Sequence, residues 1–528
     1  MINTPRARRG MVTAPHHLAS QAGLAVLRDG GNAVEATLAM AATLAVVYPH
    51  MTGIGGDGFW LTTAPGQAPL AIDACGRAGA SATPEFYRIR GLDQVPWRGP
   101  LAANTVAGTI SGWCEALDVS AGWGGRMPLA RLLEDAIWHG ENGIVVTASQ
   151  HLLTAQKLPE LRDVPGFADH FLPGGAPPKE GSMLKLPALA QTLRGLAGNG
   201  LDDFYRGELA RSIAADLARL GSPVTAIDLS SHRAERRKPL SLKLRSGTAF
   251  NFPPPPQGLS SLMILGLFER LGVREGESFA HIHGLIEATK QAFLIRDQYV
   301  GDPAAMTRDP EDFLKGPFLD GLAGRIGECA LPWPAPATAG DTVWMGAIDG
   351  QGRTASYIQS VYFEFGSGVV LPGSGIQWQN RGSSFRLAGK GPTVLAPGRK
   401  PFHTLNPALA LFDDGRTMVY GTMGGEGQPQ TQAAVFSRYV YFSQPLQQAV
   451  TAPRWLLGRT WGEQSVTLKL ENRFDPALID RLRAAGHDVE MLPDFASAMG
   501  HAGAIVLHPD GTMEGATDPR SDGAVASF

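Results

Sequence analysis

Cysteine is scarce in this chain. Only three cysteines occur in 528 residues, Cys75, Cys114 and Cys329. Their number is odd and their spacing is not that of a metal site, which excludes a disulfide framework and argues against a structural zinc. We therefore expect free thiols, no metal and the reducing cytoplasm.

Apolar runs of the kind that direct export or span a membrane are also missing. His16, His17 and Ser20 interrupt the apolar run that a signal peptide would need near the N-terminus. The most apolar stretch, residues 32–56, contains Glu35 and is rich in alanine, which favours a buried core helix over a membrane span. We expect neither export nor a membrane partner.

The chain lacks a charge excess. Charged residues make up 18% of the sequence and the formal net charge is -3, which gives no general attraction to nucleic acid. Hydrophobic residues make up 44%, a globular composition. We expect a small-molecule or peptide partner.

The chain changes character near residue 341. Helical patterns dominate before it and strand-length segments follow it, so we expect a mostly helical first part and a later part that mixes strands and helices around one core. The expected helices are 17–29, 32–47, 128–142, 187–198, 207–220 and 258–271, with further helical segments at 436–455 and 476–487. The expected strands are 342–349, 354–362, 408–414, 417–424 and 501–511.

A proline- and alanine-rich segment, "CALPWPAPATAGD" at 329–341, separates the two parts. One interpretation is an inter-domain linker. The other is a self-cleavage site, because Thr342 follows it at a strand start. Its hydroxyl could attack the carbonyl of Asp341, and water would then release a chain that begins at Thr342. The new α-amine, with a reference pKa of about 8, could act as the base. A threonine at a strand start is common without any such role.

Several motifs, in order, make the second interpretation the stronger. The chain resembles the γ-glutamyltransferase family of N-terminal nucleophile hydrolases over nearly its whole length. The resemblance implies an α+β, four-layer αββα fold. It also implies autocleavage into a large subunit, 1–341, and a small subunit, 342–528, which form one intertwined domain. That heterodimer could pair further, and no cofactor is implied. The motifs are "MVTAPHHLASQAGLAVL", "NTVAGTISGW", "FPPPPQGLS", "IEATKQAFLIRDQYVGDP", "FGSG" and "MEGATDPRSDGAV".

The resemblance implies a role for four catalytic residues. Thr342 is nucleophile and base, and Ser360 is a second hydroxyl that orients its amine, although a strand serine without a role is the ordinary alternative. Gly424 and Gly425, in "GTMGGEGQPQ", form the oxyanion hole, because glycine lets successive N–H groups point at one oxygen. A plain tight turn is the competing interpretation.

Substrate recognition departs from that of enzymes acting on glutathione. The family's carboxylate-binding arginine is replaced by Cys75, and Arg77 is the nearest guanidinium, either bound to substrate or merely exposed. The family's acidic partner for the substrate amine is replaced by Ser384, so γ-glutamyl compounds should bind poorly. The same loop adds Arg381, which would favour an anionic substrate or form a surface ion pair.

Three further residues complete the expected substrate site. His403 and Thr404 replace the family's serine pair, and His403 could equally be structural. Tyr362 adds bulk beside the nucleophile strand. Together these features suggest an amidohydrolase acting on a small carboxylated amide, and the resemblance, rather than any residue pattern, makes oxamate the leading candidate. The alternatives are γ-glutamyl transfer or hydrolysis, a glutaryl-type acylase, and an unprocessed, non-catalytic family member.

Overall fold

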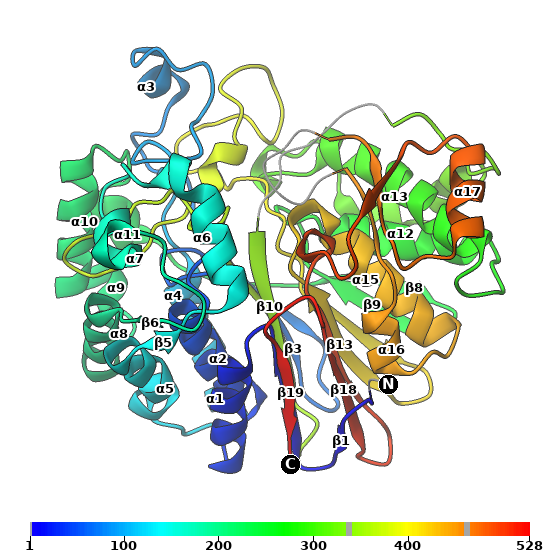
Figure 1. The fold of residues 1–528 in the computed structure, drawn as a ribbon, viewed down its shortest axis with the longest axis horizontal. Coiled ribbons are helices and arrows are strands. Elements are labelled where there is room, and N and C mark those ends of the chain that lie inside the picture. The colour runs from blue at the N-terminus through cyan, green and yellow to red at the C-terminus, as the bar shows by residue number, and fades with distance from the viewer. Residues whose placement is uncertain (1–2, 334–340, 459–464) are drawn as a thin grey trace.

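The computed structural model describes residues 3–333, 341–458 and 465–528. Most of the expected linker lies outside these residues, since 334–340 are not among them. Two seven-stranded sheets lie face to face at the centre of the molecule, and helices cover their outer faces (Figure 1). The expected four-layer αββα sandwich is confirmed.

The first sheet has the order β19-β2-β10-β11-β3-β4-β7, and all its neighbours are antiparallel. Its strands are β2 (Gly10–Ala14), β3 (Asp57–Thr63), β4 (Leu70–Ala74), β7 (Glu235–Arg237), β10 (Asp341–Asp349), β11 (Thr354–Tyr362) and β19 (Ala524–Ser527).

The second sheet has the order β1-β18-β17-β13-β12-β9-β8 and is also antiparallel. Its strands are β1 (Arg6–Ala7), β8 (Leu240–Leu244), β9 (Gly247–Asn251), β12 (Ala408–Phe412), β13 (Thr417–Thr422), β17 (Ala502–Leu507) and β18 (Met513–Thr517). Smaller sheets hold β14 (Trp455–Leu457), β15 (Leu468–Glu471) and β16 (Val489–Leu492), and β5 (Ile144–Val145) with β6 (Met183–Leu184).

Two groups of helices form the outer layers. On the first sheet, α2 packs against β10 and β11, and α4 against β3 and β4. On the second sheet, α12 packs against β8 and β9, and α15 against β13. The first layer contains α1 (His17–Arg28), α2 (Ala33–Val47), α4 (Thr109–Gly122), α5 (Leu129–Asn142), α8 (Pro187–Asn199) and α10 (Glu208–Leu220), and the second contains α12 (Gly258–Arg270), α13 (Phe279–Tyr299), α15 (Gln428–Phe436) and α16 (Leu446–Thr451). The remaining helices are α3 (Pro84–Arg88), α6 (Ala148–Leu161), α7 (Phe167–Phe171), α9 (Asp203–Arg206), α11 (Ala226–Ser231), α14 (Gly316–Ala323) and α17 (Pro476–Ala484).

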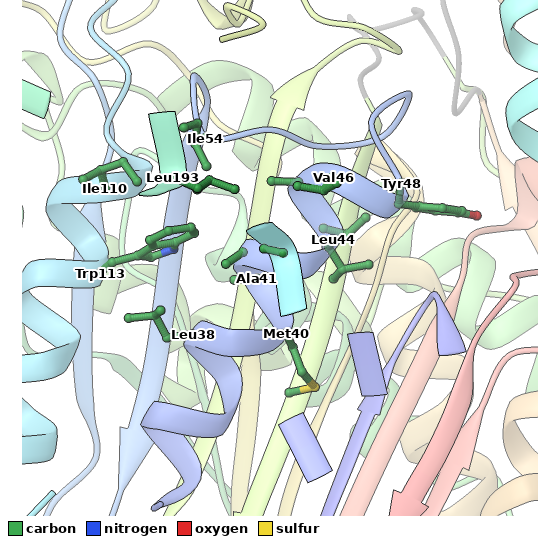
Figure 2. Close-up of a cluster of buried hydrophobic side chains, with 14 of the residues drawn as sticks. Leu38, Met40, Ala41, Leu44, Val46, Tyr48, Ile54, Ile110, Trp113 and Leu193 are labelled. Atoms are coloured by element: carbon green, nitrogen blue, oxygen red, sulfur yellow. The ribbon is translucent and has the colours of Figure 1, made fainter. Parts of the chain in front are cut away.

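Helix α2 lies at the centre of the first hydrophobic layer, as the apolar stretch predicted. Every residue of α2 is buried, and its side chains pack among those of neighbouring helices (Figure 2). The acidic residue in this stretch is a cap, since Glu35 Oε2 accepts the N–H of Asn32 at 2.8 Å. Among the described residues, no helix is long and apolar enough to cross a membrane.

The helices expected before residue 341 are all present, and the expected later strands are β10, β11, β12, β13 and β17. The first part is less helical than expected, because it also contributes β2, β3, β4, β7, β8 and β9. β2 and β3 are buried on both faces, so they lack the alternation that marks a half-exposed strand. The long helix α13 was also missed. Segments on both sides of position 341 thus supply strands to both sheets.

Candidate active site

Thr342 lies at an irregularity between two central strands. On β10, Asp341 pairs with Tyr362 of β11, and Val343 pairs with Gln359, so the register shifts across Thr342. Such bulges re-aim a side chain and are frequent beside active sites. Thr342 is buried, and β11 brings Ser360 to the neighbouring position.

Hydroxyl and amide groups surround this threonine. The side-chain amide of Gln428, at the start of α15, donates to Thr342 Oγ1 at 3.4 Å. Ser360 Oγ accepts the N–H of Tyr362 at 2.8 Å, which fixes the end of β11. Ser360 therefore has at least one structural contact close to Thr342.

The Gly424-Gly425 turn follows β13. Both glycines have positive φ, 128° and 50°, in a backbone region that residues other than glycine rarely adopt. Among the described residues, neither of their N–H groups donates a hydrogen bond. The turn can therefore present two backbone donors to an oxygen, as the oxyanion interpretation requires.

Two buried side chains, Gln257 and Arg296, brace this turn from the second helical layer. Gln257 Nε2 donates to Gly425 O at 2.8 Å and to Thr404 O at 3.0 Å. Arg296 of α13 donates to Gln257 Oε1 at 3.0 Å and pairs with Glu426 at 2.8 Å. This series of polar contacts thus links the Gly424-Gly425 turn to the loop that contains Thr404.

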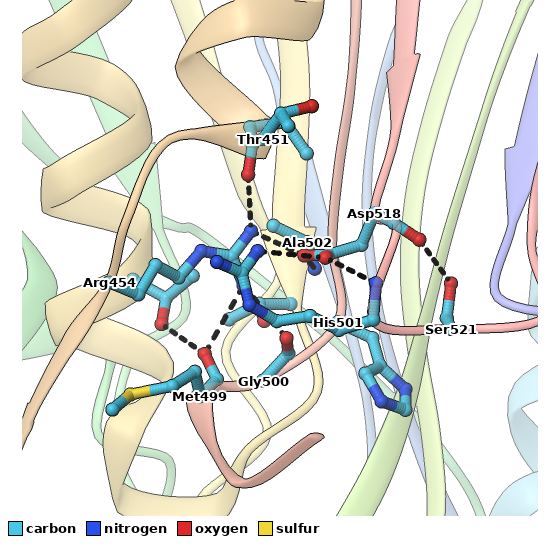
Figure 3. Close-up of polar contacts among 12 residues, drawn as sticks. Thr451, Arg454, Met499, Gly500, His501, Ala502, Asp518 and Ser521 are labelled. Carbon is cyan, nitrogen blue, oxygen red and sulfur yellow. Dashed lines mark hydrogen bonds and ion pairs between the residues drawn. The ribbon is translucent and has the colours of Figure 1, made fainter. Parts of the chain in front are cut away.

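A buried ionic network supports the other side of the turn. Arg454 donates to the carbonyls of Gly500, at 2.8 Å, and Met499, at 3.2 Å, and pairs with Asp518 (Figure 3). Arg520 pairs with the other oxygen of Asp518 at 3.0 Å. A Cβ on Gly424 would meet Gly500 Cα at 3.3 Å, so this network holds the segment that packs on the Gly424-Gly425 turn.

Arg454→Met is expected to lower the free energy of unfolding by about 3 kcal/mol, because it leaves part of the Asp518 charge buried and uncompensated. The urea midpoint of the purified protein measures this loss. Arg473→Met is the matched control: Arg473 pairs with Glu471 at 3.3 Å but is partly exposed, and Glu471 keeps its pair with Arg520 at 2.6 Å, so we expect a change below about 1 kcal/mol. Equal midpoints for the two variants would contradict the role given to Arg454.

Arg381 is the most unusual charge near the site. It is fully buried, its guanidinium carbon lies 3.5 Å from the centre of the Tyr362 ring, and Nη2 donates to Thr404 Oγ1 at 3.1 Å. Among the residues that the structure describes, its Nε and Nη1 have no hydrogen-bond partner. Burial lowers the pKa of Arg381 to about 10, so it remains charged at neutral pH. The expected alternative, a surface ion pair, is wrong.

The position of Tyr362 connects this arginine to the threonine. Tyr362 has φ 87°, a strained value for a bulky residue, and it pairs in register with Asp341. The guanidinium therefore stacks on the residue opposite the one that precedes Thr342. Such strain at a site is a reason to look for function there.

Asp57, the first residue of β3, accepts several hydrogen bonds close to Arg381. Its Oδ1 accepts from the N–H groups of Gly76 at 2.9 Å and Gly108 at 3.1 Å, and from Gln379 Nε2 at 3.0 Å. Its Oδ2 lies 3.1 Å from His403 Nε2. Both residues are buried. The carboxylate of Asp57 is therefore a structural partner for the imidazole of His403.

Burial sets the protonation of this pair. It raises the pKa of Asp57 to about 7, against the opposing effect of its hydrogen bonds and of Arg381. Burial, with a contribution from Arg381, holds the pKa of His403 well below its usual value. His403 is thus neutral near pH 7, and Asp57 changes charge there.

Two of the expected substrate residues do not join this group. The Ser384 hydroxyl is half-buried and donates within its own loop region, to the carbonyls of Arg381 at 3.0 Å and Phe402 at 3.2 Å. Arg77 is half-exposed, pairs with Glu235 at 2.9 Å and donates to Gly398 O at 3.2 Å. Both already have partners away from the guanidinium of Arg381.

Cys75 does lie near Arg381. Burial raises the pKa of the Cys75 thiol well above its usual value, and both Asp57 and Arg381 act on it electrostatically. Cys75 stands where the resemblance places the family's arginine. The guanidinium of Arg381, which belongs to another loop, therefore lies near that position. Cys114 and Cys329 are also free thiols.

Four side chains that shape this site were not predicted from the sequence, namely Asp57, Gln257, Arg296 and Gln428. Gln257, Arg296 and Gln428 lie inside motifs that carry the resemblance, and Asp57 directly follows the apolar stretch 32–56. Their burial, and therefore their need for partners, follows from the fold, and no local pattern reveals which groups those partners are.

Within the described part of the chain, two buried clusters contain metal-ligating residue types. In the first, Asp57, Cys75 and His403 converge, but the Arg381 guanidinium and the protonated thiol disfavour a cation. In the second, formed by His283, Glu287 and His487, the ammonium of Lys290 lies 2.7 Å from Glu287 Oε1 and occupies the place of a cation. We assign neither cluster a metal.

Comparison with known proteins gives consistent results. The chain matches the family described as Gamma-glutamyltranspeptidase over residues 19–528. It is 56% identical over 521 residues to the Oxamate amidohydrolase proenzyme of Klebsiella pneumoniae, and 40% identical over 521 residues to the Glutathione hydrolase-like YwrD proenzyme of Bacillus subtilis, covering 98% of each chain in both cases. The solved cephalosporin acylase from Bacillus halodurans has a TM-score of 0.92 at 33% identity, covering 100% of this chain and 97% of that one.

Proposed function

We propose, since the chain belongs to the gamma-glutamyltranspeptidase family and is a hydrolase of amide C–N bonds, that Thr342 is its nucleophile and a small carboxylated amide its substrate. The best candidate is oxamate, which would be hydrolysed to oxalate and ammonia. The observation that carries the substrate class is Arg381, a buried guanidinium with two unpartnered nitrogens. We place the reaction in the cytoplasm on the cysteine usage alone.

Autocleavage would come first. The Thr342 hydroxyl attacks the carbonyl of Asp341, the acyl group moves from nitrogen to oxygen, and water hydrolyses the ester. The products are fragments 1–341 and 342–528, which stay together because both contribute strands to both sheets. The new α-amine of Thr342 then has a pKa suited to take the hydroxyl proton near neutral pH.

Catalysis would use the same hydroxyl. It attacks the substrate amide carbon, and the N–H groups of Gly424 and Gly425 stabilise the oxyanion, at about 3 kcal/mol for each donor. Ser360 orients the amine, and Gln428 contacts the nucleophile oxygen. Ammonia leaves with the proton that the amine carries, and water then hydrolyses the acyl-enzyme.

Arg381 would bind the substrate carboxylate. A buried cation without a full set of acceptors is costly, and a carboxylate would supply the missing acceptors in a bidentate manner. Tyr362 holds the guanidinium by stacking, and Thr404 holds one of its nitrogens. Because Arg381 lies close to the start of β10, the carboxylate should lie close to the scissile amide, which favours short substrates.

A chain-length series tests this assignment. Ammonia release from oxamate, malonamate and succinamate is expected to fall about tenfold or more with each added methylene, because the carboxylate and the amide carbon can no longer both reach their partners. Turnover of a γ-glutamyl anilide should be lower still, since Ser384 offers no charge to the substrate amine. Preference for the anilide would contradict the substrate class while leaving the Thr342 mechanism standing.

The KM for an anionic amide is expected to fall about three- to tenfold between pH 8 and pH 6. Asp57, with a pKa of about 7, is ionised above that pH and offsets the charge of Arg381, whereas protonated Asp57 does not. The titration of the Thr342 amine should act mainly on kcat. Asp57→Asn should remove the pH dependence of KM, and a gel showing two fragments confirms that this variant folds. An unchanged pH profile in this variant would assign the titration to another group.

A further inference from the structure

The side-chain amide of Gln257 joins the two halves of the proposed substrate site. Its Nε2 donates to Gly425 O at 2.8 Å, in the turn proposed to hold the oxyanion, and to Thr404 O at 3.0 Å. The Thr404 hydroxyl in turn accepts from the Arg381 guanidinium at 3.1 Å. Gln257 is fully buried, and its own N–H donates to His403 O at 3.0 Å. One side chain therefore connects the turn to the cation proposed to bind the carboxylate.

A buried arginine fixes the direction in which this amide points. Arg296 carries only donors, and its Nη1 donates to Gln257 Oε1 at 3.0 Å, so the amide oxygen must face the guanidinium. The amide nitrogen then faces the two carbonyls. A reversed amide would set its oxygen against two carbonyl oxygens and its N–H groups against the guanidinium, which would leave buried donors and acceptors without partners.

A second contact of Arg296 closes these bonds into a ring. Its Nη2 pairs with Glu426 at 2.8 Å, and Glu426 directly follows Gly425 in the chain. Its Nε pairs with Asp297 at 2.7 Å, so the guanidinium is held on three sides. Arg296 is fully buried, which strengthens these charged hydrogen bonds. The ring therefore holds Gly425 and Thr404 at one separation.

That separation matters because a carboxylated amide must reach the turn and the guanidinium at once. In the shortest such compound the carboxylate carbon and the amide carbon are bonded directly, and each added methylene moves them apart by up to about 1.5 Å, one C–C bond. A misplacement on the order of 1 Å can lower a rate about a hundredfold. A site of fixed width thus selects one chain length, whereas a site whose sides can move apart accepts several.

We propose that Gln257 is a specificity-determining residue, which sets the chain length of the substrate by fixing the Gly424-Gly425 turn relative to Arg381, and that Arg296 positions Gln257. This inference rests on the proposed function, from which it takes the roles of the turn and of Arg381. Gln257 acts through two backbone carbonyls, so its loss changes the ranking of substrates rather than removing the reaction.

The chain-length series measured on Gln257→Met tests the proposal. Methionine is similar in size to glutamine but donates no hydrogen bond to the two carbonyls. The ratio of kcat/KM for oxamate to kcat/KM for succinamate is expected to fall at least about tenfold, with most of the change in kcat for oxamate. Because this ratio does not depend on how much of the protein is folded, a merely structural defect would leave it unchanged.

Gln430→Met is the matched control. Gln430 is also buried, and its amide also bonds backbone groups: Nε2 donates to Leu457 O at 3.1 Å, and Oε1 accepts the N–H of Leu457 at 2.8 Å. These bonds hold neither the Gly424-Gly425 turn nor the loop of Thr404. The ratio should therefore stay within about twofold of that of the unaltered protein.

An unchanged ratio in Gln257→Met overturns the proposal, and leaves the proposed function standing if the unaltered protein still prefers oxamate. Failure of the unaltered protein to release ammonia from oxamate would instead contradict the proposed function, and this inference with it. Should Gln257→Met not fold, Arg296→Lys gives the result. Lysine keeps the charge opposite Glu426 but lacks the planar fork that reaches Glu426 and Gln257 together, so the same ratio should fall, and no change in it would overturn the proposal.

Discussion

Thr342→Ala is expected to remain a single chain of 528 residues on a denaturing gel and to release no ammonia from oxamate. The unaltered protein should give two fragments, 1–341 and 342–528. Alanine has no hydroxyl to attack the preceding carbonyl, so neither the ester nor the new α-amine can form. Loss of a catalytic nucleophile costs on the order of 10⁶ in kcat in a well-studied hydrolase, so activity should fall below detection.

The variant should keep its fold, because alanine is smaller than threonine and fits the buried position of Thr342 at the strand irregularity. Thr342→Ser is the matched control, since serine keeps the hydroxyl and should still give two fragments. N-terminal sequencing of active, unaltered material should find a second start at Thr342. Full activity with only one N-terminus would end this mechanism.

The sequence was most informative where chemistry is local. Thr342 follows a proline-rich segment and opens a strand, and Gly424-Gly425 is a turn that needs positive φ at both residues. The helix at 33–47 could be identified from its apolar composition, and Glu35 proved to be its cap rather than a break in it. Each of these features depends on neighbours within a few residues.

Contacts between distant segments could not be predicted in this way. Asp57 and His403 are 346 residues apart in sequence and 3.1 Å apart in space. In the sequence, Arg381 is indistinguishable from an exposed loop arginine, and only the fold shows that it is buried against Tyr362. Burial converts such a charge from a solvated group into one that needs an acceptor, and burial is a property of the packed layers.

Arg77 shows that a motif offset by two residues need not bring the same contacts. Its place two residues after the family's arginine position suggested a shared role, but Cys75 and Arg77 follow the end of β4 at Ala74 and have different neighbours. Cys75, at the aligned position, faces the Arg381 group, whereas Arg77 pairs with Glu235 in a half-exposed setting. The guanidinium near Cys75 is supplied by Arg381 from a different loop.

Arg381→Met is expected to lower kcat/KM for oxamate about a thousandfold, which corresponds to about 4 kcal/mol of lost transition-state stabilisation. Methionine fills a similar volume against Tyr362 but leaves the substrate carboxylate without a cation in a buried site. Most of the loss should lie in KM if the carboxylate is bound equally in the ground and transition states. The two-fragment pattern on a gel should not change, because the proposed cleavage uses only the Thr342 hydroxyl, the Asp341 carbonyl and water.

Two controls separate this role from a structural one. Arg381→Lys keeps the charge but not the planar fork, and should recover part of the lost affinity without restoring bidentate binding. Arg77→Met, which removes a guanidinium outside the Arg381 group, should leave kcat/KM within about twofold, as expected for a partly exposed pair. If Arg77→Met were the damaging change and Arg381→Met harmless, the carboxylate would have to bind on the Glu235 side. The buried guanidinium would then serve only to balance Asp57.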